Sequence, residues 1–142
     1  MAFKPNAMTF AQGVQRITDA AKSAGLKLGK EIITSRDTSS IKACVALAVS
    51  NVPGGFKKWQ LPVYMDGPSQ MFFSIGAPDT DVPSHSHDEG DGLRVIVSGS
   101  ILFGKQELTQ GDWMFIPKGT KYQFKVGPAG AGMFYCYQCC CA

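Results

Sequence analysis

Apolar residues between positions 9 and 27 recur at steps of three and four, which is the spacing of one face of an amphipathic α-helix. They are Phe10, Val14, Ile17, Ala21 and Ala24. Thr9 is placed to cap the first turn and Gly25 to end the last one. The pattern predicts a helix over residues 9–27 that covers a sheet. A DNA-binding helix-turn-helix would need a second helix, and the next stretch predicts none.

From Ile32 onward the pattern changes to short apolar runs separated by turns that contain Gly or Pro. Residues 41–49 are apolar and fit either a strand or a short helix. The clearest strand candidates are Met71–Ile75, Val82–His87, Leu93–Val97, Ile101–Phe103, Trp113–Ile116, Tyr122–Val126 and Met133–Tyr137. Several short strands at this spacing are typical of an antiparallel sandwich or barrel.

The composition fits this fold class. The 142 residues include 16 glycines and 8 prolines and are 44% hydrophobic, which suits one turn-rich β domain spanning residues 1–142. A net charge of +3 without a basic stripe argues against nucleic-acid binding. No apolar run reaches the ~20 residues of a membrane span, and no signal-peptide pattern is visible, so we expect a cytoplasmic protein. Four of the five cysteines lie in the last seven residues, which favours reduced thiols over a disulfide framework.

The two histidines of the chain stand one residue apart, at His85 and His87. Residues i and i+2 of a β-strand project from the same face, so both imidazoles can point at one ligand. The acidic residues Asp88, Glu89 and Asp91 follow closely. Imidazole with a nearby carboxylate is a common donor set for transition metals. The cluster therefore predicts a site for a divalent metal ion.

Two segments resemble the motifs of the cupin superfamily. His85-Ser86-His87, with Gly99 at the expected distance, resembles the first motif. The opening of the second motif resembles the run Gly111-Asp112-Trp113-Met114-Phe115-Ile116-Pro117-Lys118-Gly119. The resemblance covers about residues 70–137. It implies an all-β fold, a cupin-type antiparallel β-barrel (jelly roll), here with an N-terminal α-helix.

The sequence departs from these motifs at the other ligand positions. The glutamate of the first motif falls on Gly92, and the histidine of the second falls on Tyr122. We expect Asp91 to supply the missing carboxylate, with Glu89, Tyr122 and Gln123 as alternative ligands. If the strand after the second motif keeps the family register, Tyr122 points inward and Gln123 outward, and a slip of one residue reverses them.

The resemblance implies a metal-dependent enzyme that acts on a small polar metabolite by dioxygenase, isomerase or lyase-type chemistry. His85 and His87, with Asp91 or Gln123, would hold Mn, Fe, Ni or Zn. The competing interpretation is a barrel that has lost its metal, in which the histidines are ordinary loop residues. Tyr122 is the candidate general acid or base if it is not a ligand.

Arg94 either anchors a carboxylate or phosphate group of the substrate or is a solvated strand residue. The alternative function is a non-catalytic cupin that binds a metal or a metabolite as a sensor or storage module. The resemblance also implies a homodimer.

Overall fold

The computed structural model describes residues 7–138, and its contacts divide the chain into two compact units. We call residues 7–28 and 37–64 the helical unit, and residues 29–36 and 65–138 the barrel unit. The predicted single domain over 1–142 stays a prediction. Cys139, Cys140 and Cys141 lie outside the described residues.

In the helical unit, α1 runs over Phe10–Ala24 and confirms the helix predicted from the apolar spacing. Thr9 and Gln12 form a capping box, in which the Thr9 hydroxyl accepts from the Gln12 amide and the Gln12 side chain accepts from the Thr9 amide. Gly25 ends the helix in the left-handed region, with φ of 78°. Both ends of α1 are therefore encoded by the local sequence.

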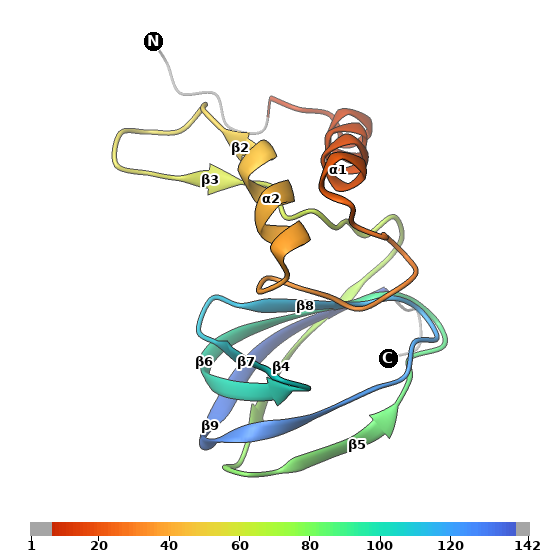
Figure 1. The fold of residues 1–142 in the computed structure, drawn as a ribbon, viewed down its shortest axis with the longest axis vertical. Coiled ribbons are helices and arrows are strands. Elements are labelled where there is room, and N and C mark those ends of the chain that lie inside the picture. The colour runs from red at the N-terminus through yellow and green to blue at the C-terminus, as the bar shows by residue number, and fades with distance from the viewer. Residues whose placement is uncertain (1–6, 139–142) are drawn as a thin grey trace. The chain divides into compact units, whose positions relative to one another are not determined.

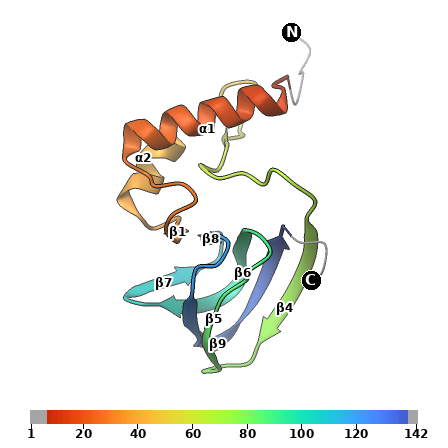
Figure 2. The same cartoon turned by 90° about the vertical axis from the view of Figure 1, so that its right-hand side faces the viewer.

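A second helix, α2 (Thr38–Ala46), follows, so the expectation that the stretch after α1 has no helix is wrong. Of the two interpretations of residues 41–49, the short helix is the one found over residues 41–46. The helices α1 and α2 lie against each other (Figure 2). Ile17 and Ala20 of α1 pack against Ala43 of α2 and Leu47 beyond it. The apolar pattern did not distinguish a helix from a strand here, because the buried positions of α2 include Ser40, while Ile41 and Val45 are exposed. The antiparallel pair of β2 (Ala48–Val49) and β3 (Lys58–Trp59) completes this unit.

The barrel unit is built from seven antiparallel strands, which confirms the predicted fold class (Figure 1). They are β1 (Ile33–Thr34), β4 (Gln70–Gly76), β5 (Asp81–His85), β6 (Gly92–Phe103), β7 (Gln106–Thr109), β8 (Trp113–Ile116) and β9 (Tyr122–Tyr137). The main order is β1-β8-β6-β9-β4, while β7 pairs with β6, and β5 pairs with β9. In the part of the chain that the structure describes, no helix is long and apolar enough to cross a membrane.

Two long strands close the barrel by changing partners along their length. The first half of β6 pairs with β8, and its second half pairs with β7. The first half of β9 pairs with β5, and its second half lies between β6 and β4 (Figure 1). The sequence predicted two strands in place of each of β6 and β9, because glycines interrupt both apolar runs. In the structure Gly99 adopts φ of 66° at a register shift, so that it bends β6 as a bulge and does not end it.

The inward side chains of β6 and β9 change from polar to apolar along the barrel. At one end Gly92 pairs with Tyr137, and Arg94 pairs with Tyr135. Farther along, Ile96 pairs with Met133 in the buried core. That core also contains Ile101, Leu108, Met114, Ile116, Phe124 and Val126. The apolar end stabilises the barrel and leaves the other end to a cluster of polar and aromatic side chains.

Candidate functional site

The histidine pair lies at the end of β5 and in the loop that follows. His85 is opposite Tyr122 of β9, with 4.5 Å between ring centroids. The His85 and His87 rings are 5.1 Å apart and nearly perpendicular. His85 Nδ1–H donates to the Pro83 carbonyl at 2.8 Å. When the His85 ring is neutral, its other nitrogen, Nε2, therefore carries no proton and can accept a hydrogen bond. Tyr122 is buried and faces the inside of the barrel, which is the orientation expected if β9 keeps the register of the second motif.

The second motif holds the loop that carries His87. Gly119 adopts φ of 75° and donates its amide to the His87 carbonyl at 2.8 Å. In the same turn the Lys118 amide donates to Asp91 Oδ1 at 2.8 Å. The Asp91 carbonyl accepts from the Gln138 amide at 2.9 Å. Asp91 therefore positions the loop and does not join the two imidazoles.

A chain of hydrogen bonds runs from Arg94 through Tyr122 to His87. The Tyr122 hydroxyl is 3.4 Å from Arg94 Nη2 and 3.1 Å from His87 Nε2. A guanidinium can only donate, so the phenol oxygen accepts from Arg94 and its own proton is free to be donated to His87. This arrangement favours the His87 tautomer with its proton on Nδ1. Burial, followed by the charges of His85 and Arg94, lowers the pKa of His87 and favours the same neutral ring.

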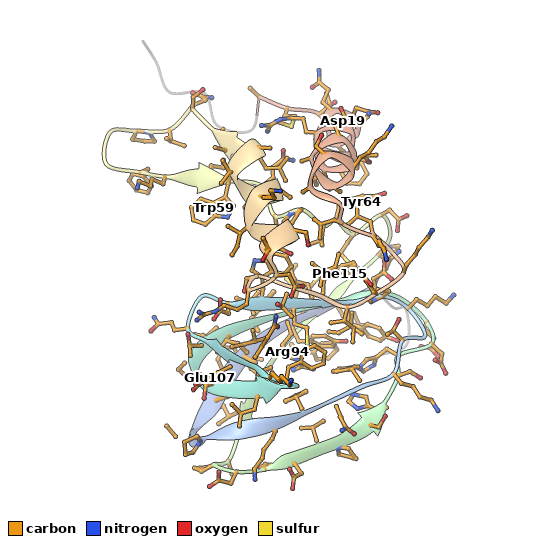
Figure 3. The ribbon with its side chains drawn as sticks, in the orientation of Figure 1. Asp19, Trp59, Tyr64, Arg94, Glu107 and Phe115 are labelled. Atoms are coloured by element: carbon orange, nitrogen blue, oxygen red, sulfur yellow. The ribbon has the colours of Figure 1, made fainter. Side chains whose placement is uncertain are left out.

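Arg94 is a buried cation of β6 and lies within the barrel unit (Figure 3). Its side chain is inside the barrel, with Cζ 4.5 Å from the Tyr135 ring centroid and 5.2 Å from that of Phe124. Nη1 approaches the weak acceptor Sδ of Met133 at 3.7 Å, and Nε has no hydrogen-bond partner. Within residues 7–138 no carboxylate forms an ion pair with Arg94; the salt bridge found there joins Arg36 to Asp112.

Tyr135 occupies the space in front of Gly92, where the first motif has its glutamate. A Cβ built on Gly92 would overlap the Tyr135 hydroxyl and approach its ring to 2.9 Å. The hydroxyl is buried and makes no hydrogen bond of ordinary geometry, with the Tyr122 phenol as a polar neighbour. Burial raises the pKa of Tyr135, so its phenol remains protonated. The phenol O–H of Tyr135, a hydrogen-bond donor, therefore occupies the place where the first cupin motif has the carboxylate of glutamate, an acceptor.

A cavity of about 530 Å³ opens beside this cluster. His87, Tyr135 and Tyr137 form part of its wall. The remaining lining residues are Phe72, Ser86, Asp88 and Glu89. Arg94 and Tyr122 lie behind this wall, in contact with Tyr135 and His87 respectively. A guest in the cavity would meet His87 and Tyr135 first.

Of the predicted site residues, His85, His87, Tyr122 and Arg94 come together. Gln123 does not, because it is exposed, on the opposite side of β9 from the buried Tyr122. Sequence reasoning assigned no role to Tyr135 or Tyr137. Their alternation with Met133 along β9 could have indicated one inward face, but the direction of that face depends on the pairing with β6.

The donor set does not fit a divalent metal ion well. Across the described chain, no three side chains of His, Cys, Asp or Glu are grouped closely enough to hold one. The phenol that could act as a third ligand already bonds to the guanidinium of Arg94, whose positive charge would repel a second cation. Because two imidazoles without a third protein donor hold a divalent ion weakly, we assign no chemical step to a metal. The predicted metal stays a prediction.

No family model matches this sequence, and no curated protein does. Among solved structures, one match is a protein of unknown function with a cupin-like fold from Ralstonia eutropha, 20% identical with a TM-score of 0.45 over 49% of this chain and 46% of that one. Another is a cupin from Bacteroides fragilis, 23% identical with a TM-score of 0.44 over 55% of this chain and 70% of that one. A polyketide cyclase from Streptomyces resistomycificus is 20% identical with a TM-score of 0.44 over 52% of this chain and 56% of that one.

These likenesses concern the fold alone, and the matched part is less than half of the Ralstonia chain. The Ralstonia structure is described as having a cupin-like fold and the Bacteroides structure as a cupin, and each match covers about half of this chain.

Proposed function

We propose that this cupin-type barrel binds a small polar carbonyl compound and catalyses proton transfer on it, as an isomerase or a lyase does. His87 is the proposed catalytic residue because it lines the cavity. Tyr122, the catalytic candidate from the sequence, is a positioning residue that acts through His87. The observation that carries the proposal is the hydrogen-bond chain from Arg94 through Tyr122 to His87.

The chain of hydrogen bonds prepares His87 to act as a donor. Since Nε2 faces the Tyr122 hydroxyl, the proton on Nδ1 is available to the oxygen of a bound carbonyl group. A neutral imidazole keeps this proton at neutral pH, which agrees with the lowered pKa of His87. Donation to the carbonyl oxygen stabilises the negative charge that develops when the neighbouring carbon loses a proton.

Two carboxylates in the same cavity wall are the proposed proton acceptors. Asp88 is held by the Ser86 hydroxyl, which donates to its Oδ1 at 2.9 Å, and Glu89 lies next to it. One carboxylate removes the proton from carbon, and the electron pair moves to the oxygen bonded to His87, which gives an enol or enolate. In an α-hydroxycarbonyl compound, return of the proton to the former carbonyl carbon completes an isomerisation, while the α-hydroxyl proton passes to the His87 nitrogen that gave its own proton to the carbonyl oxygen. Loss of a leaving group from the β-carbon, with its bonding electrons, completes an elimination instead.

Proton exchange in D₂O tests the proposal. Small carbonyl compounds with exchangeable C–H bonds, including neutral dihydroxyacetone and anionic pyruvate, are incubated with the protein and followed by ¹H NMR. We expect deuterium uptake with at least one compound and a loss of about 10²–10⁴-fold in the H87Q variant, the usual contribution of general acid–base catalysis. A second variant, Y122F, removes the hydroxyl that positions His87 and should also slow the exchange, and Y64F, a tyrosine variant in the helical unit, is its control. Deuterium uptake that is equal in wild type and H87Q would contradict the catalytic role of His87 and support a protein that only binds the compound.

The role of Tyr122 has its own measurement. ¹⁵N NMR of the two histidines distinguishes the Nδ1–H from the Nε2–H tautomer. We expect wild-type His87 to carry its proton on Nδ1, and Y122F to shift it toward Nε2 while His85 is unchanged. A His87 tautomer that is the same in both proteins would contradict the positioning role.

Metal analysis tests the metal-free form of the proposal. Protein without a histidine tag is dialysed against Mn, Fe, Ni or Zn and compared with the H85A/H87A double variant. We expect neither to retain a stoichiometric ion, and EDTA to leave proton exchange unchanged. One equivalent of metal in wild type that is absent from the double variant would overturn this form and support the original metal prediction.

A further inference from the structure

Two neighbouring donors inside the barrel have no acceptor. Among residues 7–138, three side chains have a buried polar atom without a hydrogen-bond partner, and two of them, Arg94 and Tyr135, are in contact through the cation–π pair. Arg94 is 9% exposed and Tyr135 is 8% exposed. The orphan atoms are Arg94 Nε and the Tyr135 hydroxyl, both of which carry a hydrogen. Buried donors without acceptors are uncommon and costly in folded proteins.

The barrel supplies aromatic contacts to the Arg94 cation but no counter-charge. The rings of Phe124 and Tyr135 offset part of the loss of hydration. They accept no strong hydrogen bond, and the remaining contacts are a thioether at 3.7 Å and a phenol at 3.4 Å. Tyr135 is not a substitute counter-ion, because burial holds it in the protonated form. An isolated buried charge is stabilised chiefly by an anion with matching hydrogen-bond geometry.

We infer that the site takes a small carboxylate, bound by Arg94 and Tyr135. The inference rests on the proposed function and names its substrate class: a compound that carries a carboxylate as well as a carbonyl group. Gly92 supports this assignment, because the chain has no carboxylate of its own where the first cupin motif has glutamate. The bound compound would supply the carboxylate that Arg94 lacks as a partner.

A single carboxylate suits the site better than a phosphate. Among the groups described here, Arg94 is the cation inside the barrel, whereas Asp88 and Glu89 stand in the cavity wall, so a singly charged carboxylate meets less repulsion there than a doubly charged phosphate. A planar carboxylate also matches the geometry of a guanidinium edge and accepts two parallel hydrogen bonds. Tyr135 is part of the cavity wall, and its buried hydroxyl and the Arg94 guanidinium lie behind that wall, so binding requires the wall to yield at Tyr135.

Side-chain NMR of the wild-type protein tests the inference without any substitution in the barrel. The chain has three arginines, Arg16, Arg36 and Arg94, so three Nε–H resonances are expected. Acetate and benzoate are the probes, with acetamide and benzamide as neutral partners of the same shape and inorganic phosphate as the second anion. We expect the carboxylates to shift the Arg94 resonance and slow its exchange with water, while the neutral amides leave it unchanged. The inference would be overturned if the Arg94 Nε–H resonance shifts with neither carboxylate, or if it shifts with phosphate alone.

Binding measurements on variants give the size of the effect. We expect R94M to weaken benzoate binding about 10- to 100-fold and Y135F about 2- to 10-fold, the ranges for one charged and one neutral hydrogen bond. R36M removes an exposed arginine and is the matched control, which should bind as wild type does. Benzoate affinity that is equal in wild type, R94M and Y135F would contradict the assignment of these donors.

The two hypotheses fail in different experiments. If carboxylates shift Arg94 but no carbonyl compound exchanges deuterium, the carboxylate site stands and the proposed catalysis is wrong. If dihydroxyacetone exchanges through His87 but carboxylates leave Arg94 unaffected, the catalysis stands and the substrate class is wrong.

Discussion

His87 stands among groups that oppose its protonation. Its ring is partly buried, and the charges of His85 and Arg94 add to the effect of burial in lowering its pKa, while Asp88 acts in the opposite direction. The hydroxyl of Tyr122 and the rings of Tyr135 and Tyr137 complete the surroundings of His87. An added proton would disturb the hydrogen bond that Nε2 accepts from Tyr122.

We therefore expect acid to destabilise the fold through His87. The unfolded pKa is near the ordinary 6.5 and the folded pKa is lower, so the unfolded state binds more protons between the two values. The contribution of His87 is fully present above pH 6.5 and is lost as the pH falls through its folded pKa. Urea unfolding from about pH 7.5 to 5 should show this slope in wild type and a flatter one in H87N. An identical pH slope in the two proteins would contradict the expectation.

At the same scale, the sequence located the site but not its chemistry. The His85-Ser86-His87 spacing and the second motif identified the residues that meet in the barrel. The direction of Arg94 was left open, because Leu93, Val95 and Val97 alternate with it and favour one buried apolar face. The structure buries Arg94 and leaves Val97 44% exposed, because pairing with Tyr135 turns position 94 inward.

At the scale of elements, the bend of β6 depends on a close approach of two backbones. Gly99 adopts φ of 66°, and a Cβ there would overlap the carbonyl oxygen of Gly130 in β9. Gly104, in the turn between β6 and β7, has a similar φ of 58° but open space around it. An alanine at Gly104 therefore tests backbone strain alone, whereas an alanine at Gly99 tests backbone strain together with the clash against Gly130.

This comparison predicts unequal costs for the same substitution. G104A should lower the free energy of unfolding by about 1 kcal/mol, the cost of an alanine in the left-handed region. G99A should cost about 3 kcal/mol or more, since the clash with Gly130 adds to that strain. Urea titration of both variants measures the difference. Equal losses would mean that β6 and β9 do not approach each other at Gly99.

The boundaries of elements were predictable only where local chemistry sets them. Thr9 and Gly25 cap α1, so its ends followed from the residues themselves. The strand β7 was not predicted, because Gln106–Thr109 is polar apart from the buried Leu108. It forms because it pairs with the end of β6, and that partner is contributed by tertiary structure.

At the scale of the whole molecule, one sheet face of the barrel unit is apolar and exposed. Met71, Phe73 and Ile75 alternate along β4, an edge strand, and are 72%, 60% and 83% exposed. Exposed apolar edges are usually covered or blocked with charge. The homodimer implied by the sequence resemblance, which stays a prediction, would have its interface here. A stable interface needs roughly 800 Å² from each partner, so these three residues would form its centre.

Sedimentation velocity checks this expectation. Wild type should sediment as a dimer and I75K as a monomer, because a charge in the centre of an apolar interface is not solvated. V45K places the same charge on an exposed valine of the helical unit and should remain a dimer. A wild-type monomer, or an I75K dimer, would contradict the proposed interface.

The sequence by itself determined the features that depend on neighbours along the chain: the capped helix, most of the strands, the turn glycines and the pairing of two imidazoles at the end of one strand. Tertiary structure decided the rest. The identity of the group facing the histidines depended on register, which placed Tyr122, Tyr135 and Arg94 inside the barrel and Gln123 outside. The physical reason is the two-residue period of a strand, which offers two faces and leaves the choice between them to distant partners.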